Sequence, residues 1–125
     1  MQDPPKPADL LAAVARFLRE ELMPLLSGAA AFQTRVAANA VDIARRELEL
    51  APASDMAERQ RLGALLAQEG DLAALNRELC RRIRVGEMTL ETPGLAAHLW
   101  EVTLAKLAVD QPGYASYQRE LARQR

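Results

Sequence analysis

The pattern of apolar and polar positions is clearest between Gly28 and Leu50, the longest stretch with a continuous helical periodicity. At about 100° per residue, its large apolar side chains fall on one narrow arc together with Asn39. A second apolar stripe lies roughly opposite, and only the sector that holds Ala38 and Asp42 is left for water. We therefore predict a central helix with two buried faces. The first face consists of Phe32, Val36, Ile43 and Leu50, and the second of Ala37, Val41, Ala44 and Leu48.

The same periodicity predicts four further main helices and a short terminal one. Three prolines within the first seven residues indicate a disordered or extended arm over residues 1–6, followed by a helix from about Pro7. Pro52 is expected to end the central helix, and Asp71 and Thr92 to cap the fourth and fifth helices. The fifth is also apolar nearly all round. We expect an all-α fold, an irregular helical bundle of five main helices plus a short C-terminal helix, as a single domain over residues 7–125 packed around the second and fifth helices.

Composition narrows the classes of protein that the chain can belong to. Half of its residues are hydrophobic but only 4% are aromatic, so Ala and Leu dominate and favour helix. A formal net charge of −1 argues against a general nucleic-acid binder. The lone cysteine, Cys80, the absence of a signal-peptide pattern and the absence of a long apolar run lead us to expect a cytoplasmic protein without a membrane span.

The first candidate site is a set of three polar residues, Glu21, Arg35 and Asn39. Glu21 falls in the middle of the apolar face of the first helix, where a carboxylate is unexpected. If the first two helices form an antiparallel hairpin that turns near Gly28, Glu21 and Arg35 are equally distant from the turn and should meet. Two interpretations remain open: an ion pair that fixes helix register with the help of Asn39, or a ligand-binding cleft built on the same three groups.

The second candidate pair is His98 and Glu101, one turn apart on the fifth helix. A carboxylate beside a histidine is typical of an oriented catalytic base, but an exposed pair on an ordinary helix has the same spacing. The chain has one histidine and one cysteine, which cannot supply a di-metal or zinc site. We therefore predict no metal and no cofactor.

Basic residues are concentrated near the end of the fourth helix, at Arg81, Arg82 and Arg84. They can meet a phosphate, or they can offset the negative end of the helix dipole as a solvated cap. Cys80 beside them is expected to be an inert residue on the helix surface. No glycine-rich phosphate loop and no nucleophile motif occur in the sequence.

Four segments carry a resemblance that spans nearly the whole chain: FLREELMPLL, FQTRVAANAVDIARRELEL, LNRELCRRIRVGE and LAAHLWEVTLAKLAVDQPGY. They resemble a family of small all-helical bacterial proteins of unknown function. Members of that family are often encoded near phosphotransferases of the aminoglycoside or choline kinase type and near acyl-CoA dehydrogenases. The resemblance implies an accessory role in a pathway that uses CoA thioesters, with one of these neighbours as a partner, and it supplies no catalytic residues.

These observations favour a non-catalytic accessory or protein-interaction module that self-associates, as a homodimer. The alternative is a small-molecule binding protein for an acyl or CoA-type ligand, with its cleft near Glu21, Arg35 and Asn39. An enzyme that uses His98 and Glu101 is the third possibility. No catalytic set stands out in the sequence, so the enzyme class is the least supported of the three.

Overall fold

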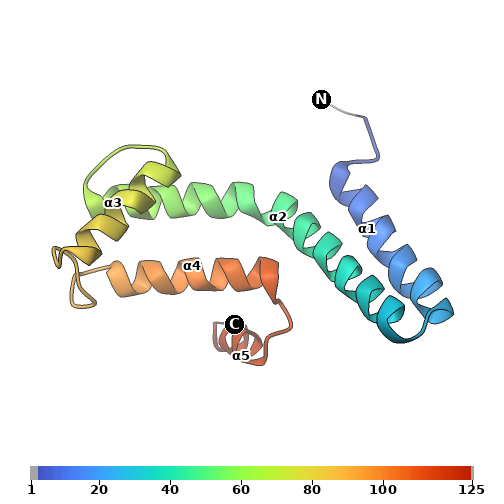
Figure 1. Cartoon of the computed structure of the whole chain (residues 1–125). Helices are drawn as coiled ribbons and strands as arrows, with labels where there is room; N and C mark the ends of the chain where they lie inside the picture. Colours follow the sequence, from blue (N-terminus) through green and yellow to red (C-terminus); the bar gives the residue numbers. More distant parts are fainter. Residues whose placement is uncertain (1–2, 125) are drawn as a thin grey trace. The chain divides into compact units, whose positions relative to one another are not determined.

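The computed structural model describes residues 3–124, and its regular elements are helical throughout this range (Figure 1). The elements in chain order are α1 (Pro7–Phe17), a π-helix (Leu18–Leu22), a short 3₁₀-helix (Met23–Leu25), α2 (Gly28–Leu66), α3 (Leu72–Arg84), α4 (Leu95–Asp110) and α5 (Ala115–Arg123). The all-α prediction is confirmed for these residues. The number of helices differs, because the predicted second and third helices are one continuous helix, α2.

Pro52 lies inside α2 and does not end it. A proline in a helix interior removes one backbone N–H and costs about 3 kcal/mol, which strong helix formers on both sides can offset. Internal contacts nevertheless divide the chain at this residue into two compact units, residues 1–51 and 52–125. The single cooperative domain that we expected over residues 7–125 stays a prediction.

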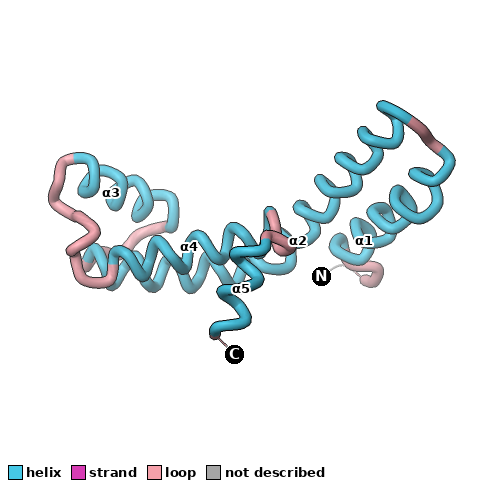
Figure 2. The backbone as a smooth tube through the Cα atoms, turned by 90° about the horizontal axis from the view of Figure 1, so that it is seen from below, coloured by secondary structure: helices cyan, strands magenta, loops and turns pink. Residues whose placement is uncertain are grey.

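The first unit is a helical hairpin in which α1 lies beside the N-terminal part of α2 (Figure 2). Its buried residues are both alanines, Ala15 on α1 and Ala38 on α2. The Arg19 guanidinium links the two helices, since it donates a hydrogen bond to Asn39 Oδ1 at 2.9 Å and forms an ion pair with Asp42. Small side chains and the two polar contacts of Arg19 therefore link the helices of this hairpin.

The orientation of α2 in the hairpin is the reverse of our prediction. The sector expected to face water contains Ala38, which is fully buried, and Asp42, which pairs with α1. The first predicted face is exposed instead, with Phe32 at 61% and Val36 at 50% exposure. Alanine allows close approach of two helices, so the small-residue sector is the one that meets α1. The prediction of a central, doubly buried helix over residues 28–50 is wrong for the described chain.

The second unit is organised around a leucine core. Leu62 and Leu66 from the end of α2 pack with Leu75 and Leu79 of α3, and Met88 and Leu95 complete the cluster. Asp71 caps α3 as predicted, since its Oδ1 accepts a hydrogen bond from Ala74 N at 2.7 Å. Thr92 is not the cap of α4, which begins at Leu95 after Gly94.

The C-terminal end of α2 is closed by a residue with left-handed backbone geometry. Ala67 has φ of 50°, and the next N–H, that of Gln68, returns to the carbonyl of Gly63 at 3.1 Å. This closure is usually made by glycine, because a Cβ in the left-handed region costs about 1–2 kcal/mol. The helix thus ends at Leu66, and Ala67 takes the left-handed position that follows it.

Replacing this residue provides a test of the helix end. Ala67→Gly should raise the free energy of unfolding by about 0.5–1 kcal/mol, because the strain at the left-handed position is larger than the extra entropy of glycine in the unfolded chain. Chemical denaturation measures the change. Ala64→Gly, one turn earlier inside α2, is the matched control and should lower the stability by about 1 kcal/mol. Equal effects of the two substitutions would contradict this assignment of the helix end.

Candidate functional site

The first candidate set does not form the predicted cluster. Glu21 and Arg35 are both exposed, and no hydrogen bond or ion pair joins them within residues 3–124. Asn39 is bonded to Arg19 instead. The physical reason is the π-helix at Leu18–Leu22, in which Met23 N bonds to Leu18 O five residues back. A π-turn has more residues than an α-turn, so the angular count that placed Glu21 on the apolar face does not apply there.

The second candidate pair lies in a cleft of the second unit. His98 and Glu101 of α4 line it together with Arg61 of α2, and the cleft has a volume of about 380 Å³. Its remaining walls are mostly apolar, formed by Ala64, Leu65, Pro93, Gly94 and Ala97. A small cleft with apolar walls and a few converging polar groups is a common form of ligand site.

Burial changes the interpretation of His98. The side chain is only 3% exposed and lies on the same buried face of α4 as Leu95 and Val109. The expectation of an ordinary exposed His98–Glu101 pair is therefore wrong for His98, although Glu101 is exposed. No hydrogen bond joins the two within the described residues, and His98 Nδ1 has no hydrogen-bond partner there. Glu101 thus does not orient the imidazole as a catalytic carboxylate would.

The protonation state of His98 follows from its surroundings. Burial of the imidazole lowers the pKa of His98 below its ordinary value of 6.5, and the nearby charge of Arg61 lowers it further, whereas Glu58 acts in the opposite direction. His98 is therefore neutral at pH 7. Because the unfolded chain takes up this proton more readily, the free energy of unfolding should fall as the pH drops below 6.5.

Arg61 is the residue of this cleft that sequence reasoning missed. Its Nε atom is buried and, like His98 Nδ1, has no hydrogen-bond partner among residues 3–124. A buried polar group without a partner costs about 1–3 kcal/mol, so the fold maintains this pair at some expense. Arg61 directly precedes the core residue Leu62 in the sequence. This position was the signal that could have placed Arg61 near the inward side of the helix.

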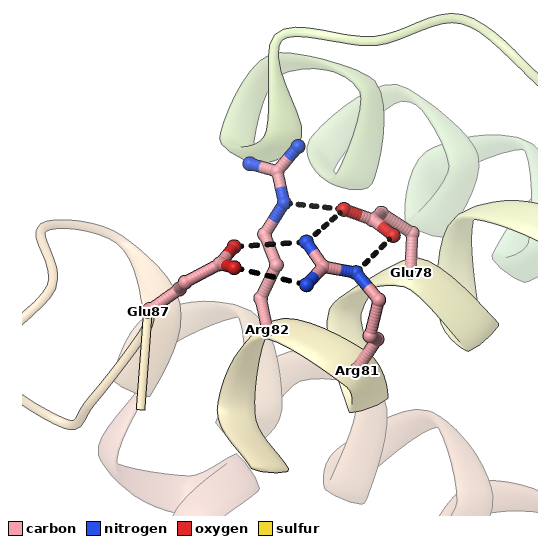
Figure 3. Close-up of polar contacts among 4 residues, drawn as sticks. All are labelled: Glu78, Arg81, Arg82 and Glu87. Atoms are coloured by element: carbon pink, nitrogen blue, oxygen red, sulfur yellow. Dashed lines mark hydrogen bonds and ion pairs between the residues drawn. The ribbon is translucent and has the colours of Figure 1, made fainter. Parts of the chain in front are cut away.

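The basic run at the end of α3 forms an ion-pair cluster (Figure 3). Arg81 donates from Nε to Glu78 Oε2 at 2.9 Å and from Nη2 to Glu87 Oε2 at 2.8 Å, and Arg82 Nε donates to Glu78 Oε1 at 2.7 Å. Two of the three arginines are thus already engaged by carboxylates, which favours the helix-cap interpretation over phosphate capture. Cys80 is a free, exposed thiol, in line with its predicted position on the helix surface.

The fold and these sites define a small all-helical protein with no group of three metal-ligating side chains among residues 3–124. No helix in the same range is both long and apolar enough to cross a bilayer. The chain belongs to the family described as Domain of unknown function (DUF6285), whose model matches residues 24–114. No curated protein and no solved structure matches the chain.

The ion-pair cluster makes a prediction about acid titration. Hydrogen bonds from Arg81 and then Arg82 lower the pKa of Glu78 from 4.5 to about 2. The stabilising contact should therefore be complete above pH 4.5 and disappear as the pH falls toward 2. Carboxyl-carbon NMR titration should give a Glu78 midpoint near 2, which the double variant Arg81→Gln/Arg82→Gln should raise toward 4.5. Arg84→Gln, in the same helical turn, is the control and should leave the midpoint in place.

Proposed function

We propose that this protein is a non-catalytic, self-associating interaction module, and that the N-terminal part of α2 forms the interface with a second copy. We call Phe32, Val36, Asn39, Ile43 and Leu50 the α2 seam. The observation that carries the proposal is the exposure of the four apolar seam residues, which range from 37% to 61% exposed. Large apolar side chains this exposed along one stripe are a recognised mark of a protein–protein contact.

The spacing of the seam supports helix-to-helix association. Steps of four, three and four residues separate Phe32, Val36, Asn39 and Ile43, and Leu50 follows one heptad after Ile43. Alternating steps of three and four are the repeat that lets two helices pack knobs into holes over a long contact. A seam of this kind is self-complementary, so a second copy of the same helix is a suitable partner.

The weakness of the isolated hairpin supports the same proposal. Its buried residues are two alanines, which remove little apolar surface from water. Nine large apolar side chains of this unit remain at least one-third exposed, including the four of the α2 seam that a second copy would cover. They are Leu10, Val14, Phe17, Leu25, Phe32, Val36, Ile43, Leu48 and Leu50. Association would supply the burial that the hairpin lacks.

In this proposal Asn39 keeps its hydrogen bond from Arg19 through Oδ1, and its amide NH2 group is the part that a second copy would meet. A single asparagine within an apolar seam sets register and number of strands at some cost in stability. Glu21 and Arg35 are exposed on the same hairpin and are available to a partner. The alternative from the sequence, an acyl or CoA-type ligand bound near these three residues, has the accessibility of their side chains as its support.

The proposal extends to the pathway and the partner proteins of this module. The family resemblance in the sequence supports an accessory role, in the bacterial cytoplasm, in a pathway that uses CoA thioesters. A phosphotransferase-like protein or an acyl-CoA dehydrogenase is the partner to test first. Co-purification of either enzyme with the intact protein, lost when the seam is altered, would support this setting.

The oligomeric state tests the interface directly. Sedimentation equilibrium should find a dimer, and Val36→Glu should raise its dissociation constant by about a hundredfold or more, because a carboxylate buried without a partner costs several kcal/mol. Leu90→Glu is the matched control, since Leu90 is 74% exposed but lies outside the hairpin. A wild-type protein that stays monomeric at all concentrations would overturn the proposal, as would equal effects of both variants.

The asparagine makes a separate prediction. Asn39→Leu should tighten association and broaden the distribution of species seen by sedimentation velocity, because an all-apolar seam no longer favours one register. Gln33→Leu adds the same side chain to the same helix away from the seam and should leave the distribution narrow. A single, unchanged species in Asn39→Leu would show that this residue does not select the assembly.

A further inference from the structure

Two residues that line the cleft between α2 and α4 each carry a buried nitrogen atom without a hydrogen-bond partner within the described chain, Arg61 at Nε and His98 at Nδ1. Both residues line the same cleft of about 380 Å³, although they belong to different helices. Most buried polar groups in native proteins are paired, so two unpaired groups in one cleft call for an explanation. A ligand that bonds to both would provide one.

The donor chemistry of the two groups restricts the ligand. The guanidinium N–H of Arg61 can only donate a hydrogen bond. Neutral imidazole carries one N–H, which in one of its two tautomers is on Nδ1. In that tautomer the cleft offers two N–H donors, and their natural partner is a pair of acceptor oxygens such as those of a carboxylate.

The charges of the residues that line the cleft restrict the class of ligand further. Arg61 contributes one positive charge, which one carboxylate balances. Glu101 also lines the cleft, and it forms no ion pair with Arg61. Glu101 repels each negative charge on a ligand, so a dianion such as phosphate is disfavoured relative to a monoanion.

The walls of the cleft indicate what the carboxylate is attached to. Ala64, Leu65, Pro93 and Ala97 line the cleft together with Arg61 and His98 and make most of its wall apolar. Gly94 has φ of 87° and lies beside Leu65, since a Cβ added at Gly94 would be in ordinary contact with Leu65 Cδ1 at 3.5 Å. A short apolar group fits such walls better than a polar one.

We propose that the cleft between α2 and α4 binds a small organic monocarboxylate. Its two oxygens accept hydrogen bonds from Arg61 Nε and His98 Nδ1. Its short apolar group packs against Leu65 and Ala97. This site lies wholly within residues 52–124 and is separate from the α2 seam, so each proposal can fail without the other.

Nuclear magnetic resonance of the full chain tests the proposal with butyrate as the probe. His98 is the only histidine, so its ring nitrogens give an unambiguous signal. Butyrate should shift the His98 ring and Arg61 Nε signals saturably. Butyramide, which has the same shape without the charge, should bind about tenfold or more weakly. The absence of a saturable shift with butyrate would overturn the proposal, and so would tighter binding of inorganic phosphate or butylammonium.

Variants locate the binding. Arg61→Gln should weaken butyrate about tenfold or more, because it removes the charge and the Nε donor together. Arg77→Gln makes the same change at an exposed site on α3 and should have no effect. Arg61→Lys is the second variant in case Arg61→Gln does not fold, and the loss of the Nε donor should weaken binding even though the charge is kept.

The Glu101→Gln variant distinguishes between two classes of ligand, a carboxylate and a cationic or zwitterionic compound. Removal of a repelling charge should leave butyrate affinity equal or improved. Loss of butyrate binding in this variant would mean that Glu101 holds the ligand, and would overturn the proposed arrangement.

Discussion

The leucine contact between the end of α2 and α3 is the interaction on which the second unit depends. Leu62 and Leu66 come from the last turns of α2, and Leu75 and Leu79 face them from α3. Asn76 of α3 donates a hydrogen bond to Glu58 of α2 at 2.8 Å, and Arg59 Nε of α2 donates one to the carbonyl of Gly70 in the loop between the two helices, also at 2.8 Å. The core fixes the rotation of α2 about its axis, and this rotation places Arg61 in the cleft that faces His98.

The first unit has no comparable core. Ala15 and Ala38 allow α1 and α2 to approach closely, but they bury too little apolar surface to stabilise a hairpin of this length. The long apolar side chains of α2 lie on the other side of the helix, where the hairpin does not cover them. Self-association through the α2 seam and ligand binding in the cleft therefore depend on different parts of α2, on the two sides of Pro52.

Several predictions from the sequence agree with the structure because they depend on local chemistry. The helical character of the chain follows from its content of Ala and Leu, and the Asp71 cap follows from a side chain that can reach a backbone N–H three residues on. The prediction at Pro52 was wrong because strong helix formers on both sides can offset the cost of one proline. The observed end of α2 has no glycine to mark it in the sequence, because Ala67 takes the left-handed position that glycine usually takes.

The sequence by itself determined which positions are apolar and the periodicity with which they recur, because both are properties of residue order. It correctly placed Phe32, Val36 and Ile43 on one stripe of α2. Only the tertiary structure decided which sector of the helix meets α1, since small and large side chains compete for the contact and the choice depends on the neighbouring helix. In the same way His98 and Glu101 were visible as a pair, but Arg61, which lines the same cleft, comes from another helix. No local pattern in the sequence brings these residues to one cleft.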